Sequence, residues 1–172
     1  MIELWHILLI GPTLLYANGL EWALHKYVLH GLGGNKNSIF SYHWHIHHRR
    51  VRKSAGYDTD YNKKKWWRIK AITQERLSLF LLLVLHFPLA FWIPTVWLTL
   101  VYAMFNYYRV HRKAHLDVNW AKKHLRWHYD HHMGRNQNAN WCITRPWFDW
   151  IMGTRVHYVE KIRRKNSNFK KR

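Results

Sequence analysis

Residues 77–105 read LSLFLLLVLHFPLAFWIPTVWLTLVYAMF and contain no Asp, Glu, Lys or Arg. As a single helix the stretch would be about 43 Å long, at ~1.5 Å per residue, which exceeds the ~30 Å hydrocarbon core of a bilayer. Pro88 and Pro94 interrupt helical hydrogen bonding near its middle. The stretch therefore predicts a helical hairpin with arms at about 68–87 and 94–115. One kinked membrane span is the alternative.

A second apolar stretch opens the chain and is long enough to cross a bilayer. Residues 4–20 are almost wholly apolar, and 22–24 extend them to the roughly 20 residues that a span needs. The first residues carry no basic cluster of the kind that precedes a cleaved signal, so we expect a retained anchor. The anchor runs into His25 and His30, and the glycines that follow are expected to end the helix.

The distribution of charge favours a membrane protein with one basic side. The chain has 28 Lys and Arg against 9 Asp and Glu, a net charge of +19. No Lys or Arg lies in residues 1–25 or 77–108, so the basic residues follow the pattern of cytoplasmic loops beside membrane spans. We therefore expect a protein of the bacterial inner membrane or the endoplasmic reticulum, and not a nucleic-acid-binding protein.

Three further segments suit the membrane surface. Residues 63–67 read KKKWW and are typical of an interfacial anchor, and PWFDW at 146–150 is expected at the headgroup level. The basic tail at 161–172 is expected to be attracted to anionic lipid. Cys142 stands alone, which excludes a disulfide framework and any metal site built on several cysteines.

Histidine is the metal ligand that the sequence supplies in excess. Fifteen are present, and twelve of them form four clusters near the edges of the apolar stretches. Neutral imidazole suits zinc, copper, iron or nickel. The clusters are His25 and His30; His43, His45, His47 and His48; His111 and His115; and His124, His128, His131 and His132.

The spacing within the clusters predicts how the rings point. Separations of three and four residues put the rings of the two later clusters on one helix face each. His43 and His47 share a face, with His48 turned about 100° further round. His25 and His30 are five residues apart, about 140° of rotation, so an ideal α-helix cannot aim both at one metal. Two metals, or a distorted helix end, would accommodate them, and the pattern favours a dinuclear site.

The four clusters, read in order with HKYVLH, HWHIHH, HRKAH and HYDHH, resemble the histidine motifs of a known family. This is the fatty acid hydroxylase / sterol desaturase superfamily of membrane di-iron enzymes, which includes the bacterial carotene hydroxylases. FDWIMGT at 148–154 is similar to the FD-x2-FGT ending of that family, with Met152 in place of the aromatic residue. The resemblance covers roughly residues 15–155, and we expect one domain over 1–172.

The resemblance implies an all-α integral membrane protein. One N-terminal span and a helical hairpin would carry a histidine-rich helical cap on the cytoplasmic face. The implied metal ligands are His25, His30, His43, His47, His48, His111, His115, His128, His131 and His132. His45 and His124 are extra to the pattern, and the choice of His43 over His45 is open.

The resemblance also implies two iron ions, dioxygen as co-substrate and a separate electron donor of ferredoxin or cytochrome type. The implied activity is oxygen-dependent hydroxylation of a fatty acyl or related lipid in the bilayer. Carotenoid hydroxylation, or desaturation of a sterol or another lipid, is the alternative within the family. Candidate acceptors for the ring N–H groups of the ligands are Glu21, Asp117, Asp130 and Asp149.

Two alternatives belong to other classes of protein. A non-catalytic basic membrane protein that binds anionic lipid would show salt-sensitive binding and no metal requirement. A haem-based electron carrier would need histidine pairs on facing spans inside the bilayer, whereas these clusters lie at the ends of the predicted spans. The histidine spacing therefore favours the metalloenzyme.

Overall fold

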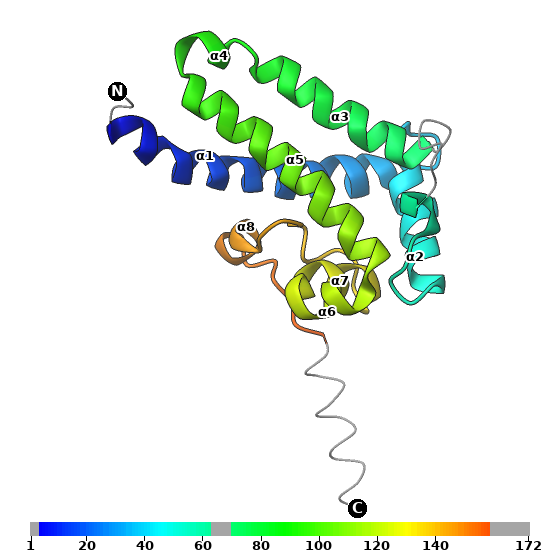
Figure 1. The fold of residues 1–172 in the computed structure, drawn as a ribbon. Helices are drawn as coiled ribbons and strands as arrows, with labels where there is room; N and C mark the ends of the chain where they lie inside the picture. Colours follow the sequence, from blue (N-terminus) through cyan, green and yellow to red (C-terminus); the bar gives the residue numbers. More distant parts are fainter. Residues whose placement is uncertain (1–3, 63–69, 159–172) are drawn as a thin grey trace, which may run out of the picture.

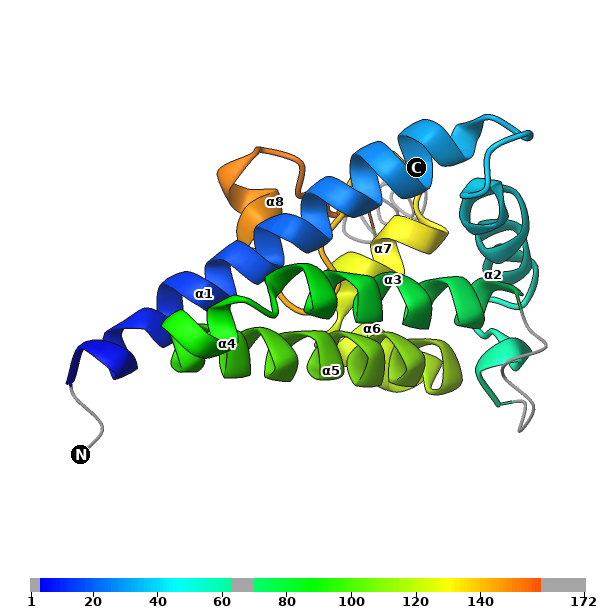
Figure 2. The same ribbon diagram turned by 90° about the horizontal axis from the view of Figure 1, so that it is seen from above.

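The computed structural model describes residues 4–62 and 70–158, and this part of the chain is helical with no strand. Three long helices, α1 (Leu4–Ala23), α3 (Lys70–His86) and α5 (Pro94–Leu116), lie side by side (Figure 1 and Figure 2). α1 and α5 run in the same direction and α3 runs in the opposite one. The ends of α1 and α5 and the start of α3 therefore meet at one end of the molecule.

Shorter helices complete the fold. Those with α-helical geometry are α2 (Arg49–Lys53), α4 (Leu89–Trp92), α6 (Val118–His124), α7 (Arg126–Met133) and α8 (Trp147–Ile151). Two π-helices, η1 (Leu24–Gly31) and η3 (His43–His48), and two 3-10 helices, η2 (Leu32–Gly34) and η4 (Thr59–Asn62), lie between them. α2, α6 and α7 lie near the end of the molecule where α1 and α5 end and α3 begins, whereas α4 lies at the opposite one (Figure 1). The histidine clusters are thus carried largely by short elements.

Proline explains how α3 and α5 are joined. α3 ends at His86, two residues before Pro88, and Pro94 occupies the first turn of α5, where a missing N–H leaves no helical hydrogen bond unmade. The short α4 fills the turn between them. Phe91 and Trp92 on α4 are 76% and 81% exposed, so the turn presents aromatic side chains to its surroundings.

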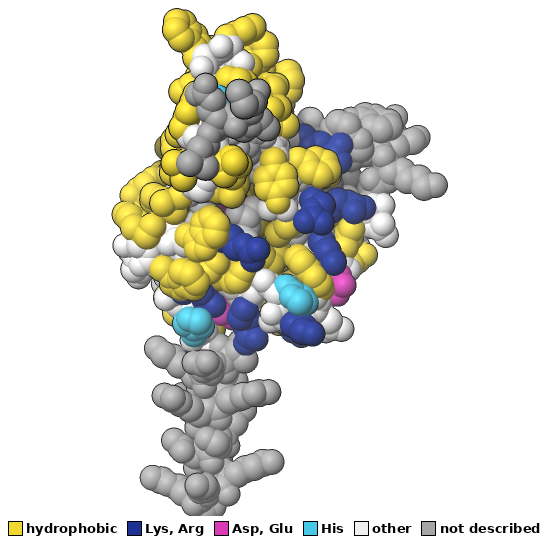
Figure 3. All heavy atoms as spheres, turned by 60° about the vertical axis from the view of Figure 1, so that its left-hand side comes forward, with side chains coloured by type: hydrophobic (Ala, Val, Ile, Leu, Met, Phe, Trp, Pro, Cys, Tyr) yellow, Lys and Arg dark blue, Asp and Glu magenta, His cyan; other side chains and the backbone are white. Residues whose placement is uncertain are grey.

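The distribution of side chains is the reverse of that in a water-soluble protein. Among the described residues, 13 buried side chains are hydrophobic and 17 are polar or charged. Large hydrophobic residues lie exposed along the three long helices, for example Leu8, Leu85 and Phe105. Figure 3 shows hydrophobic side chains over the upper part of one face and most of the Lys and Arg in its lower half. An apolar surface of this extent is typical of contact with lipid or another apolar partner.

One helix in the described part of the chain, Trp5–Gly34, is long and apolar enough to cross a membrane. This helix comprises α1 with η1 and η2, and it matches the predicted N-terminal span in position. The passage of α3 and α5 through a bilayer stays a prediction. The KKKWW anchor at 63–67 and the basic tail at 161–172 lie outside the described residues.

α8 packs the C-terminal region against α1. Phe148 lies beside Trp22, and a Cβ on Gly19 would come within 2.9 Å of the Phe148 ring, so glycine permits this close approach. Trp22 forms a buried cluster with Trp141 and with the free thiol of Cys142. The packing fixes residues 139–145 beside the end of α1. The placement of PWFDW at the lipid headgroups stays a prediction.

Candidate metal centre

Both π-helices change which histidines face each other. In η1 the Leu32 N–H donates to the Tyr27 carbonyl, five residues back, as in a π-helix. Residues five apart then lie on nearly the same face, and the rings of His25 and His30 are 5.0 Å apart between centroids. Of the two alternatives that the spacing of His25 and His30 allowed, a distorted helix end is present in the structure, in the form of a π-helix.

The second π-helix corrects one of our predictions. His43 and His48 are also five residues apart, and their Nε2 atoms are 3.2 Å apart. The rings of His43 and His47 are also in contact, with centroids 5.3 Å apart, although His47 belongs to a different group of candidate ligands. The expectation that His48 would be turned about 100° away was wrong because it assumed α-helical rotation throughout the HWHIHH segment.

Two groups of histidines emerge that could each hold a metal ion. Within each group, the candidate ligand atoms all lie within 4.8 Å of one another. The five-histidine group comprises His25, His30, His43, His48 and His131. The four-histidine group comprises His47, His111, His115 and His132.

His128 adjoins the four-histidine group, with its Nε2 3.2 Å from Nε2 of His115. All ten histidines that the family resemblance implied thus lie in or beside the two groups. The two extra histidines do not. The Nε2 atom of His45 lies 3.0 Å from the Gly34 carbonyl oxygen, and His124 is an exposed residue beside Trp120.

Backbone carbonyls fix the orientation of rings in the five-histidine group. The Nδ1 atoms of His25 and His131 lie 2.6 and 2.7 Å from the carbonyl oxygens of Trp141 and Ala139. A carbonyl oxygen only accepts hydrogen bonds, so each Nδ1 carries the proton and donates it. The Nε2 atom of each ring is therefore left with a free lone pair.

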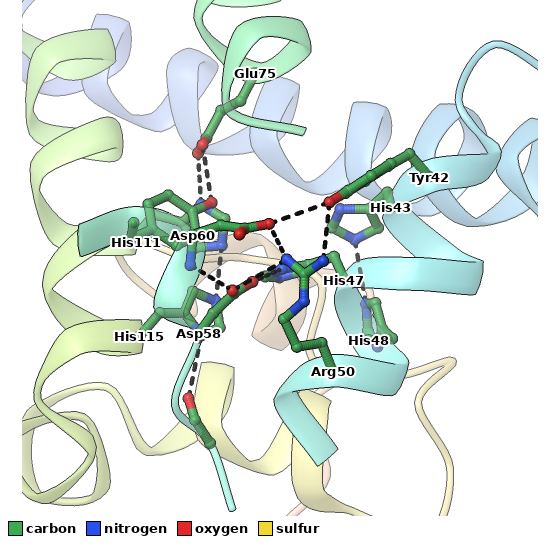
Figure 4. Close-up of polar contacts among 12 residues, drawn as sticks. Tyr42, His43, His47, His48, Arg50, Asp58, Asp60, Glu75, His111 and His115 are labelled. Carbon is green, nitrogen blue, oxygen red and sulfur yellow. Dashed lines mark hydrogen bonds and ion pairs between the residues drawn. The ribbon is translucent and has the colours of Figure 1, made fainter. Parts of the chain in front are cut away.

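In the four-histidine group, carboxylates fix the orientation of two of the rings (Figure 4). His47 Nδ1 donates to Asp58 Oδ2 at 3.0 Å, and His111 Nδ1 donates to Glu75 Oε1 at 2.5 Å. Arg50 pairs with Asp58, which holds that carboxylate in place. The Nε2 atoms of His47 and His111 are therefore left with a free lone pair as well.

The inward-facing nitrogens are arranged as metal ligands. Nε2 of His25 lies 3.0 Å from Nε2 of His43, and Nε2 of His115 lies 3.2 Å from Nε2 of His111. Nδ1 of His111 and of His115 faces an oxygen acceptor, so their two Nε2 lone pairs face each other and repel unless a cation lies between them. Ligands about 2.1 Å from a metal and 90° apart would be about 3.0 Å from each other, which matches the observed spacing.

Unsatisfied nitrogen atoms support the same conclusion. Among the described residues, Nε2 of His47, Nδ1 of His128 and both ring nitrogens of His132 are buried without a hydrogen-bond partner. A buried polar atom without a partner costs about 1–3 kcal/mol, and coordination to a metal would remove that cost. The residues present therefore fit a metal ion in each group.

Burial keeps the rings in the protonation state that binds metal. Desolvation lowers the pKa of His48, His131 and His132 well below its usual value, and neighbouring histidines lower it further. Burial also lowers the pKa of His47, against the opposing effect of Asp58. Neutral imidazole is the metal-binding form, so no proton has to be removed from these rings at pH 7.

The four carboxylates that we expected beside the ligands have other partners. Glu21 accepts hydrogen bonds from the backbone N–H groups of Ile143 and Thr144 at 3.1 and 3.0 Å. Asp117 is exposed and caps α6 by accepting from the N–H of Trp120. These predictions relied on closeness in sequence, which did not reveal the direction of each side chain.

The remaining two expected acceptors are buried and act on the surrounding chain. Asp130 pairs with Arg126 and Arg155. Asp149, from the FDWIMGT motif, accepts from the N–H of Trp141 at 2.9 Å. Since the Trp141 carbonyl accepts from His25, Asp149 positions that ligand through the backbone.

Sequence reasoning missed Asp58 and Glu75, the two carboxylates that do face ligand rings. Asp58 lies in a polar loop ten residues after His48, and Glu75 lies near the start of an apolar helix. The scarcity of acidic residues was an available signal, because the chain has only nine. A lone carboxylate entering an apolar helix is costly unless it has a partner.

An apolar cavity of about 170 Å³ lies between α1, α3 and α5 and reaches both histidine groups. Its walls include Leu24, Leu79, Leu82, Leu100 and Met104, and His25, His43, His47 and His111 line it as well. The cavity offers a space that suits a hydrocarbon chain and ends at two groups of histidines that could each hold a metal ion.

No protein-family model, no curated protein and no solved structure matches this chain.

Proposed function

We propose that this chain is an integral-membrane, oxygen-dependent di-iron hydroxylase that acts on a fatty acyl or related lipid chain. The observation that carries the proposal is the convergence of two buried histidine groups at an apolar cavity between helices. Histidine-only coordination suits iron among other metals, and the family resemblance of the four histidine motifs favours iron. Two irons, when bound, would supply the activation of dioxygen that reaction at an unactivated C–H bond requires.

The protein's own residues have separate tasks in this proposal. Leu79, Leu82 and Met104 would bind and orient the hydrocarbon chain and exclude water from the reacting carbon. Asp58 and Glu75 hold the proton on Nδ1 of His47 and His111, which keeps both Nε2 atoms available as ligands. The exposed apolar surface of the long helices would let a lipid enter from within the bilayer.

The proposed orientation places the histidine end on the cytoplasmic side of the membrane. The support is the basic sequence around that end and the absence of Lys and Arg from residues 1–25 and 77–108. A separate electron donor of ferredoxin or cytochrome type would then reach the site from the cytoplasm. Carotenoid hydroxylation and lipid desaturation share these requirements, so product analysis has to distinguish them.

Metal analysis of the protein purified in mild detergent from cells grown on iron-57 tests the proposal. We expect one iron per histidine group and the Mössbauer signal of a coupled diferric pair. His47→Ala and His131→Ala, one from each group, should lose iron and lose the hydroxylated lipid in cells. His45→Ala is the matched control from the same segment and should keep both.

Two results would contradict the proposal. One is a protein that retains its fold, as judged by circular dichroism, but binds no metal. The other is a full complement of iron in both ligand variants. If anionic vesicles bound the metal-free protein in a salt-sensitive way and no metal were found, the lipid-binding alternative would take its place.

A further inference from the structure

A second approach to the histidines lies on the polar side of the molecule. A groove formed by η3, α2 and the segment around residue 137 reaches His48 from outside. We call it the basic groove, and define it by Lys36, Trp44, Arg49, Arg52 and Gln137. None of the residues that line this groove belongs to α1, α3 or α5, whereas the apolar cavity lies between those helices. α2 lies far from α4 (Figure 1 and Figure 2).

The charge on this groove is not neutralised locally. Lys36, Arg49 and Arg52 are all exposed. No carboxylate of the described residues forms an ion pair with them, and Arg52 donates to the Gly134 carbonyl oxygen at 2.9 Å. The nearby acids are already engaged, because Asp58 and Asp60 pair with Arg50. The groove therefore presents net positive charge to any partner.

Trp44 connects this surface to the five-histidine group. Its ring centroid lies 4.6 Å from that of His30 and 5.3 Å from that of His48. The side chain is only partly buried and lines the groove. A molecule seated in the groove would thus reach His48 directly and be separated from His30 by a single aromatic side chain.

We infer that the basic groove is the docking site of an acidic one-electron carrier protein, whose electrons pass through Trp44 to the five-histidine group. This inference rests on the proposed function. Hydroxylation of a C–H bond by dioxygen consumes two electrons and two protons and yields the alcohol and one water. Two molecules of reduced carrier are therefore oxidised per turnover, one electron each. Opposite charge on the two partners would speed their encounter and fix their orientation.

The test measures reduction of the iron-loaded protein in detergent micelles by an acidic plant-type ferredoxin, followed by stopped-flow absorbance. The double variant Lys36→Glu/Arg49→Glu should lower the second-order rate constant about tenfold or more at low salt. The difference should shrink in 0.5 M NaCl, because the Debye length falls to a few Å. Lys123→Glu, an exposed charge reversal on α6, is the control and should change the rate little.

A second variant separates docking from electron transfer. Trp44→Leu should leave ferredoxin binding unchanged and slow the electron-transfer step about tenfold. Reduction by dithionite, a small chemical reductant, should proceed at the wild-type rate in every variant. The iron content of every variant is measured, so that slower reduction caused by lost iron is recognised as such.

The outcomes distinguish this inference from the proposed function. If iron is present but neither variant changes the rate with ferredoxin, the docking site is wrong and the proposed function stands. If no redox-active iron is found, the proposed function fails and the inference fails with it. If charge reversal abolishes binding to phosphatidylserine vesicles and leaves the ferredoxin rate unchanged, the groove is a lipid-binding surface and the inference is overturned.

Discussion

The metal-free protein should unfold in mild acid, and the structure sets the steepness of that transition. Six histidines outside the candidate span Trp5–Gly34 and the helices α3 and α5 have a pKa lowered by burial: His43, His47, His48, His128, His131 and His132. In the unfolded chain each would titrate near 6.5. The native state therefore binds fewer protons than the unfolded state below that pH. Its stability is present above pH 6.5 and is lost as the pH falls.

Each such group removes about 1.4 kcal/mol of stability per pH unit once its unfolded form is protonated. Six groups together remove up to about 8 kcal/mol per pH unit, whereas a whole domain is stable by only about 5–15 kcal/mol. The free energy of unfolding should thus fall to zero within about two pH units below 6.5. Bound metal would oppose this, because it competes with protons for the same Nε2 atoms.

Near-ultraviolet circular dichroism of chelator-treated protein in detergent, titrated from pH 8 to 4.5, measures the transition. His132→Ala should shift the unfolding transition to lower pH. It should also reduce the slope of the free energy of unfolding against pH by about one proton, or about 1.4 kcal/mol per pH unit. His124→Ala, an exposed histidine, should leave it unchanged. A metal-free protein that kept its tertiary signal to pH 4.5 would refute the reasoning, since the buried rings would have to accept protons without unfolding.

Other predictions concern the residues around the ligands. Asp58→Asn should weaken metal binding in the four-histidine group about 10–100-fold, since it removes the carboxylate that orients His47, and metal titration of the apoprotein would detect this. Gly56→Ala should destabilise the protein by about 1 kcal/mol or more, because Gly56 has φ +109° and a Cβ there would lie 3.1 Å from Val118. Thermal unfolding measures the loss of stability, and an unchanged midpoint would contradict the prediction. Asp149→Asn should loosen His25 through the Trp141 carbonyl and reduce metal content, whereas Asp117→Asn, at the exposed cap of α6, should leave metal content unchanged.

The sequence predicted the helical class and the histidines that come together, because both depend on local pattern. A charge-free stretch broken by Pro88 and Pro94 specifies two helices and a turn, and histidines at helical spacings lie on shared faces. The ten expected ligands gather around two centres in the structure. The extra residue His45 turns toward the Gly34 carbonyl and away from both centres.

What the sequence did not reveal depends on contacts between distant segments. Glu75 reaches His111 across 36 residues, and the Trp141 carbonyl reaches His25 across 116. No local pattern encodes such pairings, so closeness in sequence selected Asp130 and Asp117 instead. The division of His47 and His48 between different groups also depended on π-helical geometry, which the composition of HWHIHH does not specify.

If the two histidine groups hold metal, as proposed, the two π-helices would link the shape of the backbone to metal binding. π-helices are rare and occur mostly as single turns, so η1 and η3 need a compensating interaction to persist. Without metal, either segment could return to α-helical winding, and each residue of slippage would rotate His30 or His48 by about 100°. Metal insertion and the last step of folding would then be one event. Amide hydrogen exchange within residues 24–31 and 43–48, compared with and without added metal, would therefore report whether metal binding orders these segments.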